Sequence, residues 1–261
     1  MDWTSSNDAV ATVDQTGKVT GQGLGTAIIT ATSQDDPSIT ATCTVTVDNH
    51  EYVVIGGLKW ATCNIGATKP TDYGWYFSWG NTEGYVHDGT KWVKASDSSK
   101  TLGTDGKFSS ANYNNTPGYS LSGDISPASV NDAARINWGG DWRMPTKEEF
   151  KDLYDACGCT GTPETGGSKD TKNKGVYWCT SYDGVAGLLF IAENNGPHLF
   201  FPAAGYSHDA SRSDASTSGL YWSSTWYSAD SAYYLRFTSS DVYPQNHNYR
   251  YFGRSVRPVS D

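Results

Sequence analysis

The sequence predicts an all-β domain over residues 1–48, followed by a larger α+β domain over residues 49–261. Three observations predict this division. Short runs of alternating apolar and polar residues, separated by turn residues, fill the first part. The second part is rich in aromatic residues and glycine, and only two of its segments carry helix signals. Near the C-terminus the apolar residues recur with a period of two, which is typical of a strand.

Strands are expected in the first domain wherever apolar and polar residues alternate. The expected strands lie within residues 3–14, 19–25, 26–32 and 39–47, and turn residues separate them. In the last of these strands, threonines occupy every second position from Thr40 to Thr46. Short strands at such close spacing predict a sheet sandwich.

The second domain begins with an apolar strand from Tyr52, a Gly56-Gly57 turn and a second short strand. Residues 73–80 are so dense in aromatics that they predict a buried strand between glycine turns. Residues 84–123 are polar and lack a sustained period. They predict long surface loops with at most one short hairpin, over residues 85–93.

Two helices are predicted in the second domain. The first runs from Ser126 to Arg135, with proline at its first helical position and a stop at residues 138–140. The second begins at the capping box formed by Thr146 and Glu149 and ends at Gly158. Its apolar residues recur at helical spacing and predict one buried face. They are Phe150, Leu153, Tyr154 and Cys157.

Further strands are expected at residues 175–180, 187–192, 199–203 and 219–223, after a polar loop over residues 161–174. From Tyr233 the period of two assigns Tyr233, Leu235 and Phe237 to a core face. The same period assigns Tyr234, Arg236 and Thr238 to the outer face.

Residues 243–253 lose the apolar period and are crowded with Tyr, Asn, Gln, His and Arg. Such a composition suits a solvent-facing surface that makes adaptable contacts. It is equally compatible with a polar hairpin loop. Residues 255–259 then predict a short closing strand.

The charge of the chain argues against two classes of partner. A net charge of −9 and a pI of 4.9, without a basic cluster, disfavour nucleic acid and anionic membranes. No apolar run approaches the roughly 20 residues that a membrane-spanning helix needs. No signal peptide begins at Met1, so we expect either a mature fragment or a cytoplasmic protein.

Catalytic and metal-binding patterns are sparse. The five histidines are scattered, and neither a G-x-S-x-G motif nor a glycine-rich phosphate loop occurs. The five cysteines cannot all pair, and Cys157 and Cys159 form a C-x-C without the further ligands of a zinc site. Most of the cysteines are expected to be small buried apolar residues. We therefore expect no catalytic residue, no metal and no cofactor.

The first 47 residues resemble a known module. WTSSNDAVATVDQTGKVTGQGLGTAIITATS at residues 3–33 and ATCTVTV at residues 41–47 are similar to the second half of a group 2 bacterial immunoglobulin-like domain. That domain is nearly twice as long, so we expect a truncated copy whose opening strands precede Met1. In the family such modules are spacers on bacterial surface proteins, which implies an exported parent protein.

The second domain carries another resemblance. Its residues 57–68, 73–80, 132–134, 138–146, 201–206, 221–224 and 255–259 are similar, in order, to the Fibrobacter succinogenes major paralogous (FISUMP) domain of Bacteroidetes surface proteins. Such domains look like members of the C-type lectin fold superfamily. The resemblance implies a C-type lectin-like fold, in which a small twisted antiparallel sheet and two helices support long loops. That superfamily includes both binding proteins and the formylglycine-generating enzyme, so the fold alone assigns no function.

Three functional classes follow from this resemblance. An enzyme like the formylglycine-generating enzyme would need a reactive cysteine pair in a cleft, whereas Cys157 and Cys159 lie at a predicted helix end. A calcium-dependent lectin would carry Glu-Pro-Asn or Gln-Pro-Asp with Trp-Asn-Asp. The nearest approach, at residues 244–246, lacks the acidic residues that calcium prefers. Metal-free binding of a protein or a glycan is the class we favour, and a carbohydrate-binding lectin-type module is the alternative.

The C-terminal stretch is the expected binding site. It is similar to retroelement-diversified proteins of the same fold, in which a fixed A-Y-x-L-x-F framework separates variable positions. A binding surface that does not vary would produce the same sequence pattern. We expect a non-enzymatic extracellular or cell-surface adhesion protein, with an outer-membrane-anchored parent. One exposed aromatic patch would contact a protein or glycan ligand. The expected residues are Trp226, Tyr227, Tyr234, Arg236, Tyr243, Gln245, His247, Tyr249 and Tyr251.

Overall fold

The structure is a computed structural model that describes residues 1–261 except 24, 48–49, 159–163, 166–174 and 193–195. The contacts divide the chain into two compact units. One comprises residues 1–50 with 138–141, and the other residues 51–137 with 142–261. Cys159, most of the predicted loop 161–174 and part of the predicted joint after residue 47 lie outside the described residues. Among the described helices, none has the length and apolar character to cross a membrane.

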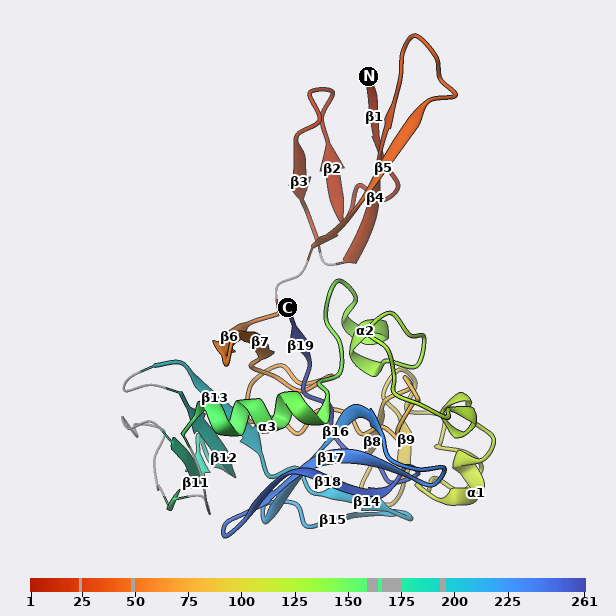
Figure 1. Ribbon diagram of the computed structural model, residues 1–261. Coiled ribbons are helices and arrows are strands. Elements are labelled where there is room, and N and C mark those ends of the chain that lie inside the picture. Colours follow the sequence, from red (N-terminus) through yellow and green to blue (C-terminus); the bar gives the residue numbers. More distant parts are fainter. Residues whose placement is uncertain (24, 48–49, 159–163, 166–174, 193–195) are drawn as a thin grey trace. The chain divides into compact units, whose positions relative to one another are not determined.

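The first unit consists of short strands. They are β1 (Asp2–Ser5), β2 (Ala11–Val13), β3 (Val19–Gly21), β4 (Gly25–Thr32) and β5 (Thr40–Val47). One antiparallel sheet has the order β1-β4-β5, and β2 pairs with β3 (Figure 1). Alternate residues of β4, among them Ala27 and Ile29, are buried as its sequence period predicts. The predicted strands of this part are present.

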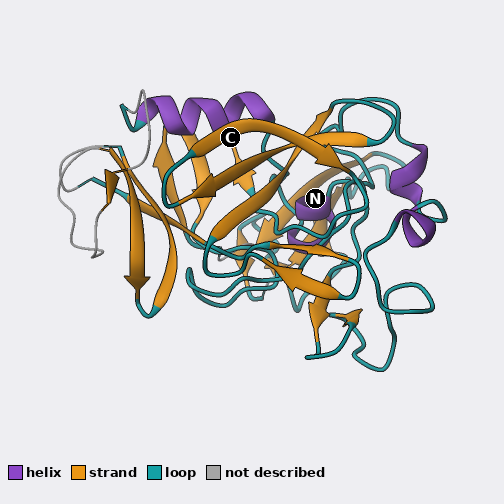
Figure 2. Cartoon of the chain, turned by 90° about the horizontal axis from the view of Figure 1, so that it is seen from below, coloured by secondary structure: helices purple, strands orange, loops and turns teal. Residues whose placement is uncertain are grey.

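The second unit is also mainly β. Its strands are β6 (Tyr52–Ile55), β7 (Leu58–Ala61), β8 (Tyr85–His87), β9 (Trp92–Lys94), β10 (Glu164–Thr165), β11 (Gly175–Tyr182), β12 (Val185–Ile191), β13 (His198–Pro202), β14 (Tyr206–His208), β15 (Ser211–Ser213), β16 (Ser218–Trp226), β17 (Ser231–Thr238), β18 (Val242–Tyr249) and β19 (Val259–Ser260). They form the sheets β10-β11-β12-β13, β16-β17-β18 and β19-β7-β6, and the hairpins β8-β9 and β14-β15. Figure 2 shows how small the helical part is beside these strands and the long loops.

Helix α3 (Lys147–Ala156) confirms the stronger helix prediction. Thr146 accepts a hydrogen bond from the Glu149 backbone, and the Glu149 carboxylate accepts one from the Thr146 backbone, so the capping box is complete. The apolar face of the helix packs into the main core with residues from several sheets. In Figure 1 the helix runs along the sheet β16-β17-β18.

The other helix prediction is only partly right. Helix α2 spans Ala133–Trp138, not residues 126–135, because turns occupy residues 126–132. The buried Asp132 carboxylate caps this helix, accepting hydrogen bonds from the backbone nitrogens of Ala134 and Arg135. It also accepts from the Met144 backbone, so the cap joins two segments. The short helices α1 (Ser110–Tyr113) and η1 (Pro117–Ser120) were not predicted.

Residues 76–80 are buried as predicted and residues 73–75 are half-buried, but the segment does not form a continuous strand. Only isolated bridges occur, from Tyr76 to Tyr85 and from Phe77 to Arg254. Gly74 and Gly80 have φ of 70° and 76°, in the left-handed region, which interrupts extended pairing at both ends of the segment.

Residues 84–123 contain the predicted hairpin, as β8-β9, but they are not only surface loops. Trp92, Phe108 and Tyr113 from this segment are buried. The ring centroids of Trp92 and Phe108 lie 5.2 Å apart, in an edge-on arrangement. Because these rings lie at irregular spacing in a polar sequence, no period indicates their burial.

Candidate binding surface

Strand β18 is the most exposed strand of the C-terminal sheet. Along its length, exposed residues alternate with half-buried ones, so that Tyr243, Gln245, His247 and Tyr249 project into solvent. The segment up to Tyr249 is therefore a strand, which overturns the interpretation of these residues as a hairpin loop. The half-buried positions include Asn246 and Asn248, so the strand has no apolar period, which is why the pattern did not indicate it.

A β-bulge interrupts the pairing of β17 with β18. Tyr234 pairs with Asn246, whereas Arg236 pairs with Tyr243, so β18 contains one residue more than β17 between these pairs. Pro244 lies in this interval and has no backbone N–H to donate. The register therefore changes in the middle of the predicted site.

The bulge divides the predicted patch between two faces of the sheet. Directly opposed residues of an antiparallel pair share a face, so Tyr233 shares one with His247, and Arg236 shares one with Tyr243. Tyr233 and Arg236 are three positions apart on β17 and so lie on opposite faces. His247 and Tyr243 consequently point to opposite sides of the sheet. The expectation of one continuous patch is wrong.

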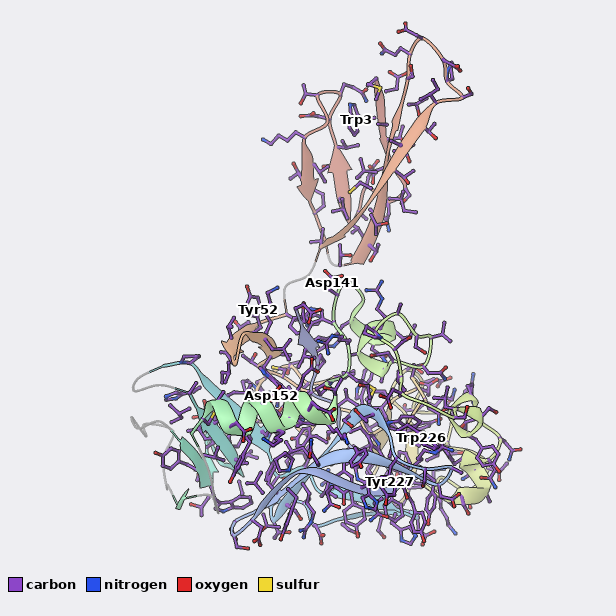
Figure 3. The ribbon with its side chains drawn as sticks, in the orientation of Figure 1. Trp3, Tyr52, Asp141, Asp152, Trp226 and Tyr227 are labelled. Carbon is purple, nitrogen blue, oxygen red and sulfur yellow. The ribbon has the colours of Figure 1, made fainter. Side chains whose placement is uncertain are left out.

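The face that carries His247 has an aromatic stack. The rings of Tyr227 and His247 are nearly parallel, with centroids 3.6 Å apart. Tyr233 meets the Tyr227 ring edge-on at 5.2 Å, and the Lys147 ammonium lies 4.2 Å from the centre of the Tyr233 ring. Tyr227 is 43% exposed. Figure 3 shows Tyr227 and its neighbour Trp226 at the end of β16.

The opposite face carries Arg236 and Tyr243. The Arg236 guanidinium lies 5.7 Å from the centre of the Tyr243 ring, and Tyr243 is 45% exposed.

Trp226 pairs with Ala232 at the other end of the sheet and is half-buried. Its indole nitrogen is buried without a hydrogen-bond partner among the described residues.

Tyr234 does not belong to an exposed surface. It is 3% exposed, and its ring meets that of Trp222 edge-on at 5.9 Å. The Arg254 guanidinium lies 3.8 Å from the centre of the Tyr234 ring. The assignment to an outer face is wrong because Trp222 and Arg254 cover the face of β17 that carries the Tyr234 ring.

A second aromatic cluster surrounds the end of β18. Tyr249 stacks with Tyr251 at 5.3 Å, and Phe252 meets both rings edge-on. Tyr206 and His208 from β14 complete the cluster by contacting Phe252 at 5.6 and 4.9 Å. The sequence interpretation did not assign Tyr206 and His208 to the site, because they are more than 40 positions before Tyr249 and lie in no periodic run.

Two backbone N–H groups of β18 are hydrogen-bonded to asparagine side chains of the same strand. The backbone N–H of His247 donates to the Asn246 side chain at 2.8 Å, and that of Tyr249 donates to the Asn248 side chain at 2.7 Å. These N–H groups would otherwise be available to an added strand. Both N–H groups are therefore already bonded, which disfavours backbone pairing at these two positions and favours recognition by side chains.

No group of three or more metal-ligating side chains is present within the described part of the chain. The cysteines differ widely in exposure, since Cys43 is exposed, Cys63 half-buried, and Cys157 and Cys179 buried. Burial raises the pKa of the Cys179 thiol to about 11. A buried thiol with a raised pKa is a poor nucleophile.

Alkylation should separate these thiols. In the folded protein, iodoacetamide is expected to label Cys43 quickly and to leave Cys179 unmodified, because Cys43 is exposed and Cys179 is buried. Unfolding in urea should make Cys179 as reactive as Cys43. Peptide mass spectrometry of samples quenched over time measures both rates, and rapid native labelling of Cys179 would contradict the structure.

Two family models match parts of the chain. The bacterial Ig-like domain (group 2) matches residues 1–52. The N-terminal part is Ig-like. Residues 173–259 match a domain of unknown function, DUF8237, which covers β11 to the start of β19 and so includes the candidate surface.

Curated relatives also match parts of the chain. Intimin of Escherichia coli O157:H7 is 29% identical over 129 residues, which are 46% of this chain and 14% of intimin. Intimin of Escherichia coli O111:H- is 32% identical over 39% of this chain and 12% of its own length. Lacto-N-biosidase of Bifidobacterium bifidum is 51% identical over 69 residues, which are 26% of this chain and 6% of that protein. The chain thus spans a small fraction of these relatives, and no solved structure matches it.

Proposed function

We propose that the chain is part of a non-enzymatic adhesion protein at the bacterial cell surface, and that its C-terminal sheet binds a protein partner. The match to a bacterial Ig-like domain and the similarity to intimin support a surface adhesion protein. In this proposal the Ig-like domain is a spacer in an exported, outer-membrane-anchored parent protein. The C-terminal domain is a FISUMP domain of C-type lectin-like fold.

The exposed side chains of β18 are the observation that carries this proposal. Tyr243, His247 and Tyr249 combine large rings with polar groups, and such residues are frequent anchors of protein interfaces. Stacking on Tyr227 holds the His247 ring before a partner arrives, which lowers the entropy lost on binding. The backbone N–H groups of His247 and Tyr249 are already hydrogen-bonded, which favours recognition by the side chains.

The positions on β18 also suit sequence variation. An exposed residue on an edge strand can change without altering the core, because its side chain contacts few buried groups. In a retroelement-diversified protein, residues such as Tyr243, Gln245, His247 and Tyr249 would vary while Leu235 and Phe237 stayed constant. A glycan partner is the second candidate, since the exposed ring of Tyr249 stacks with the half-buried ring of Tyr251.

Single substitutions test the proposed surface. Tyr243→Ser, His247→Ser and Tyr249→Ser should each leave the melting temperature nearly unchanged, because all three side chains are exposed. At least one should weaken binding more than tenfold, the effect of removing an interface anchor. Binding would be measured against immobilised mucin, fibronectin and collagen, and on a glycan array.

Tyr119→Ser is the matched control, because Tyr119 is 47% exposed and lies outside the β18 surface. It should bind like the unchanged protein. If Tyr119→Ser weakens binding as much as the β18 substitutions, or if none of the β18 substitutions weakens it, the proposed surface is wrong. Because His247 and Tyr243 lie on opposite faces, the effective substitution also identifies the face that contacts the partner.

A further inference from the structure

A pocket of about 350 Å³ lies in the second unit, among residues that the β18 surface does not include. Residues 80–83, 115–117 and 130–131 line it, together with Ser78, Tyr85 and Leu102. Its volume is at the lower end of the range of small-molecule sites, about 300–1,000 Å³. It is therefore large enough for a small ligand.

Asparagine side chains fix the walls of this pocket. The Asn81 amide donates to the hydroxyls of Ser78 and Thr116 at 2.8 and 3.0 Å, and its oxygen accepts from the Gly118 backbone. The Asn131 amide donates to the Gly80 carbonyl at 2.7 Å. These bonds join three segments that are distant in the sequence. The pocket is thus formed before any ligand arrives.

The pocket is electrically neutral. Glu83 is the only ionisable carboxylate among its lining residues, and both of its oxygens are engaged. One accepts from the Lys94 ammonium at 2.8 Å, and the other accepts from the Ser96 hydroxyl at 2.9 Å. A charged ligand would find no counter-charge here, since Lys94 is already paired.

The remaining lining groups suit a ligand that carries both hydroxyl and C–H groups. The Thr82 hydroxyl and the Asn131 carbonyl oxygen make no hydrogen bond within the described part of the chain. Apolar surface comes from Tyr85, Leu102 and Val130. A ligand held here can exchange hydrogen bonds with the polar groups and pack its C–H groups on the apolar ones.

We propose that this pocket binds a neutral saccharide unit, independently of the partner at β18. The assignment follows from the pocket's fixed walls, its volume, its neutral charge and its mixed polar and apolar lining. No metal ion is required, because the polar contacts come from hydroxyl and amide groups.

Titration of the full chain with methyl glycosides of glucose, galactose and N-acetylglucosamine tests the proposal. In ¹⁵N–¹H spectra, at least one glycoside should cause saturable shifts at Gly80, Thr82 and the Asn131 side-chain amide. Thr82→Val removes a hydroxyl at constant shape and should weaken this binding about tenfold. Val130→Trp should block the pocket, and Val130 is 77% exposed, so the larger ring fits without disturbing the core.

Thr20→Val is the matched control, because Thr20 is exposed on β3 in the first unit. It should leave saccharide binding unchanged, as should Tyr243→Ser. The proposal is overturned if no glycoside shifts the pocket resonances, if the pocket substitutions do not weaken binding, or if acetate and phosphate produce the same shifts. Loss of saccharide binding in Tyr243→Ser would place the site on β18 instead.

Discussion

Tyr234→Ser is expected to lower the free energy of unfolding by about 3–5 kcal/mol, the range for truncating a large buried aromatic side chain. The Tyr234 ring is 3% exposed and packs against Trp222 and the Arg254 guanidinium. Removing it leaves a cavity on the central strand of the sheet. The neighbouring strands β16 and β18 hold that strand in place, so the cavity cannot close without disturbing both pairings.

Tyr243→Ser provides the matched comparison, since the same chemical change occurs one strand away on a side chain that is 45% exposed. Its effect should stay within about 0.5 kcal/mol. Urea unfolding followed by tryptophan fluorescence measures both values. Equal stability of the two variants would contradict the burial of Tyr234 and restore it to the candidate surface.

Much of the fold could be predicted because local signals agreed with tertiary structure. The capping box at Thr146 and the helical spacing from Phe150 gave α3 to within a residue at its start. The alternation along residues 26–32 gave β4 for the same reason. In both elements one face is buried and the other is not, and only this arrangement produces a period in the sequence.

The candidate surface was only partly predictable. Exposure of Tyr243, His247 and Tyr249 followed from composition, but the face of each residue depends on the bulge opposite Leu235. A period of two cannot locate such a bulge, because one extra residue reverses every later assignment. Tyr234 was misplaced for a different reason, since its ring is buried against Trp222 and Arg254, and a period of two does not reveal such neighbours.

The buried arginines of the C-terminal stretch could not be recognised from the sequence either. Arg254 and Arg257 are both 0% exposed, and burial lowers the pKa of each to about 10. Neither has a carboxylate partner within hydrogen-bonding distance among the described residues. The two arginines differ in their hydrogen bonds, so we expect the same substitution to have different effects on the free energy of unfolding.

Arg257→Met is expected to destabilise the protein by about 3 kcal/mol or more. The Arg257 guanidinium donates to the Asn64 side chain at 2.8 Å and to the backbone carbonyls of Ala61, Thr62 and Phe200 at 2.7–3.0 Å. Methionine fills a similar volume but leaves these buried acceptors without a donor, and each such loss costs about 1–3 kcal/mol.

Arg254→Met should instead lower the free energy of unfolding by no more than about 1 kcal/mol, or raise it. The three guanidinium nitrogens of Arg254 have no hydrogen-bond partner in the described structure. The rings of Trp222 and Tyr234, with centres 4.0 and 3.8 Å away, supply cation–π attraction of about 2 kcal/mol. The cost of desolvating a buried charge offsets a gain of that size. An apolar side chain packs between the same rings without this desolvation cost. Parallel urea titrations of the two variants decide the matter, and a loss at Arg254 as large as that at Arg257 would mean that the Arg254 guanidinium is hydrogen-bonded in solution.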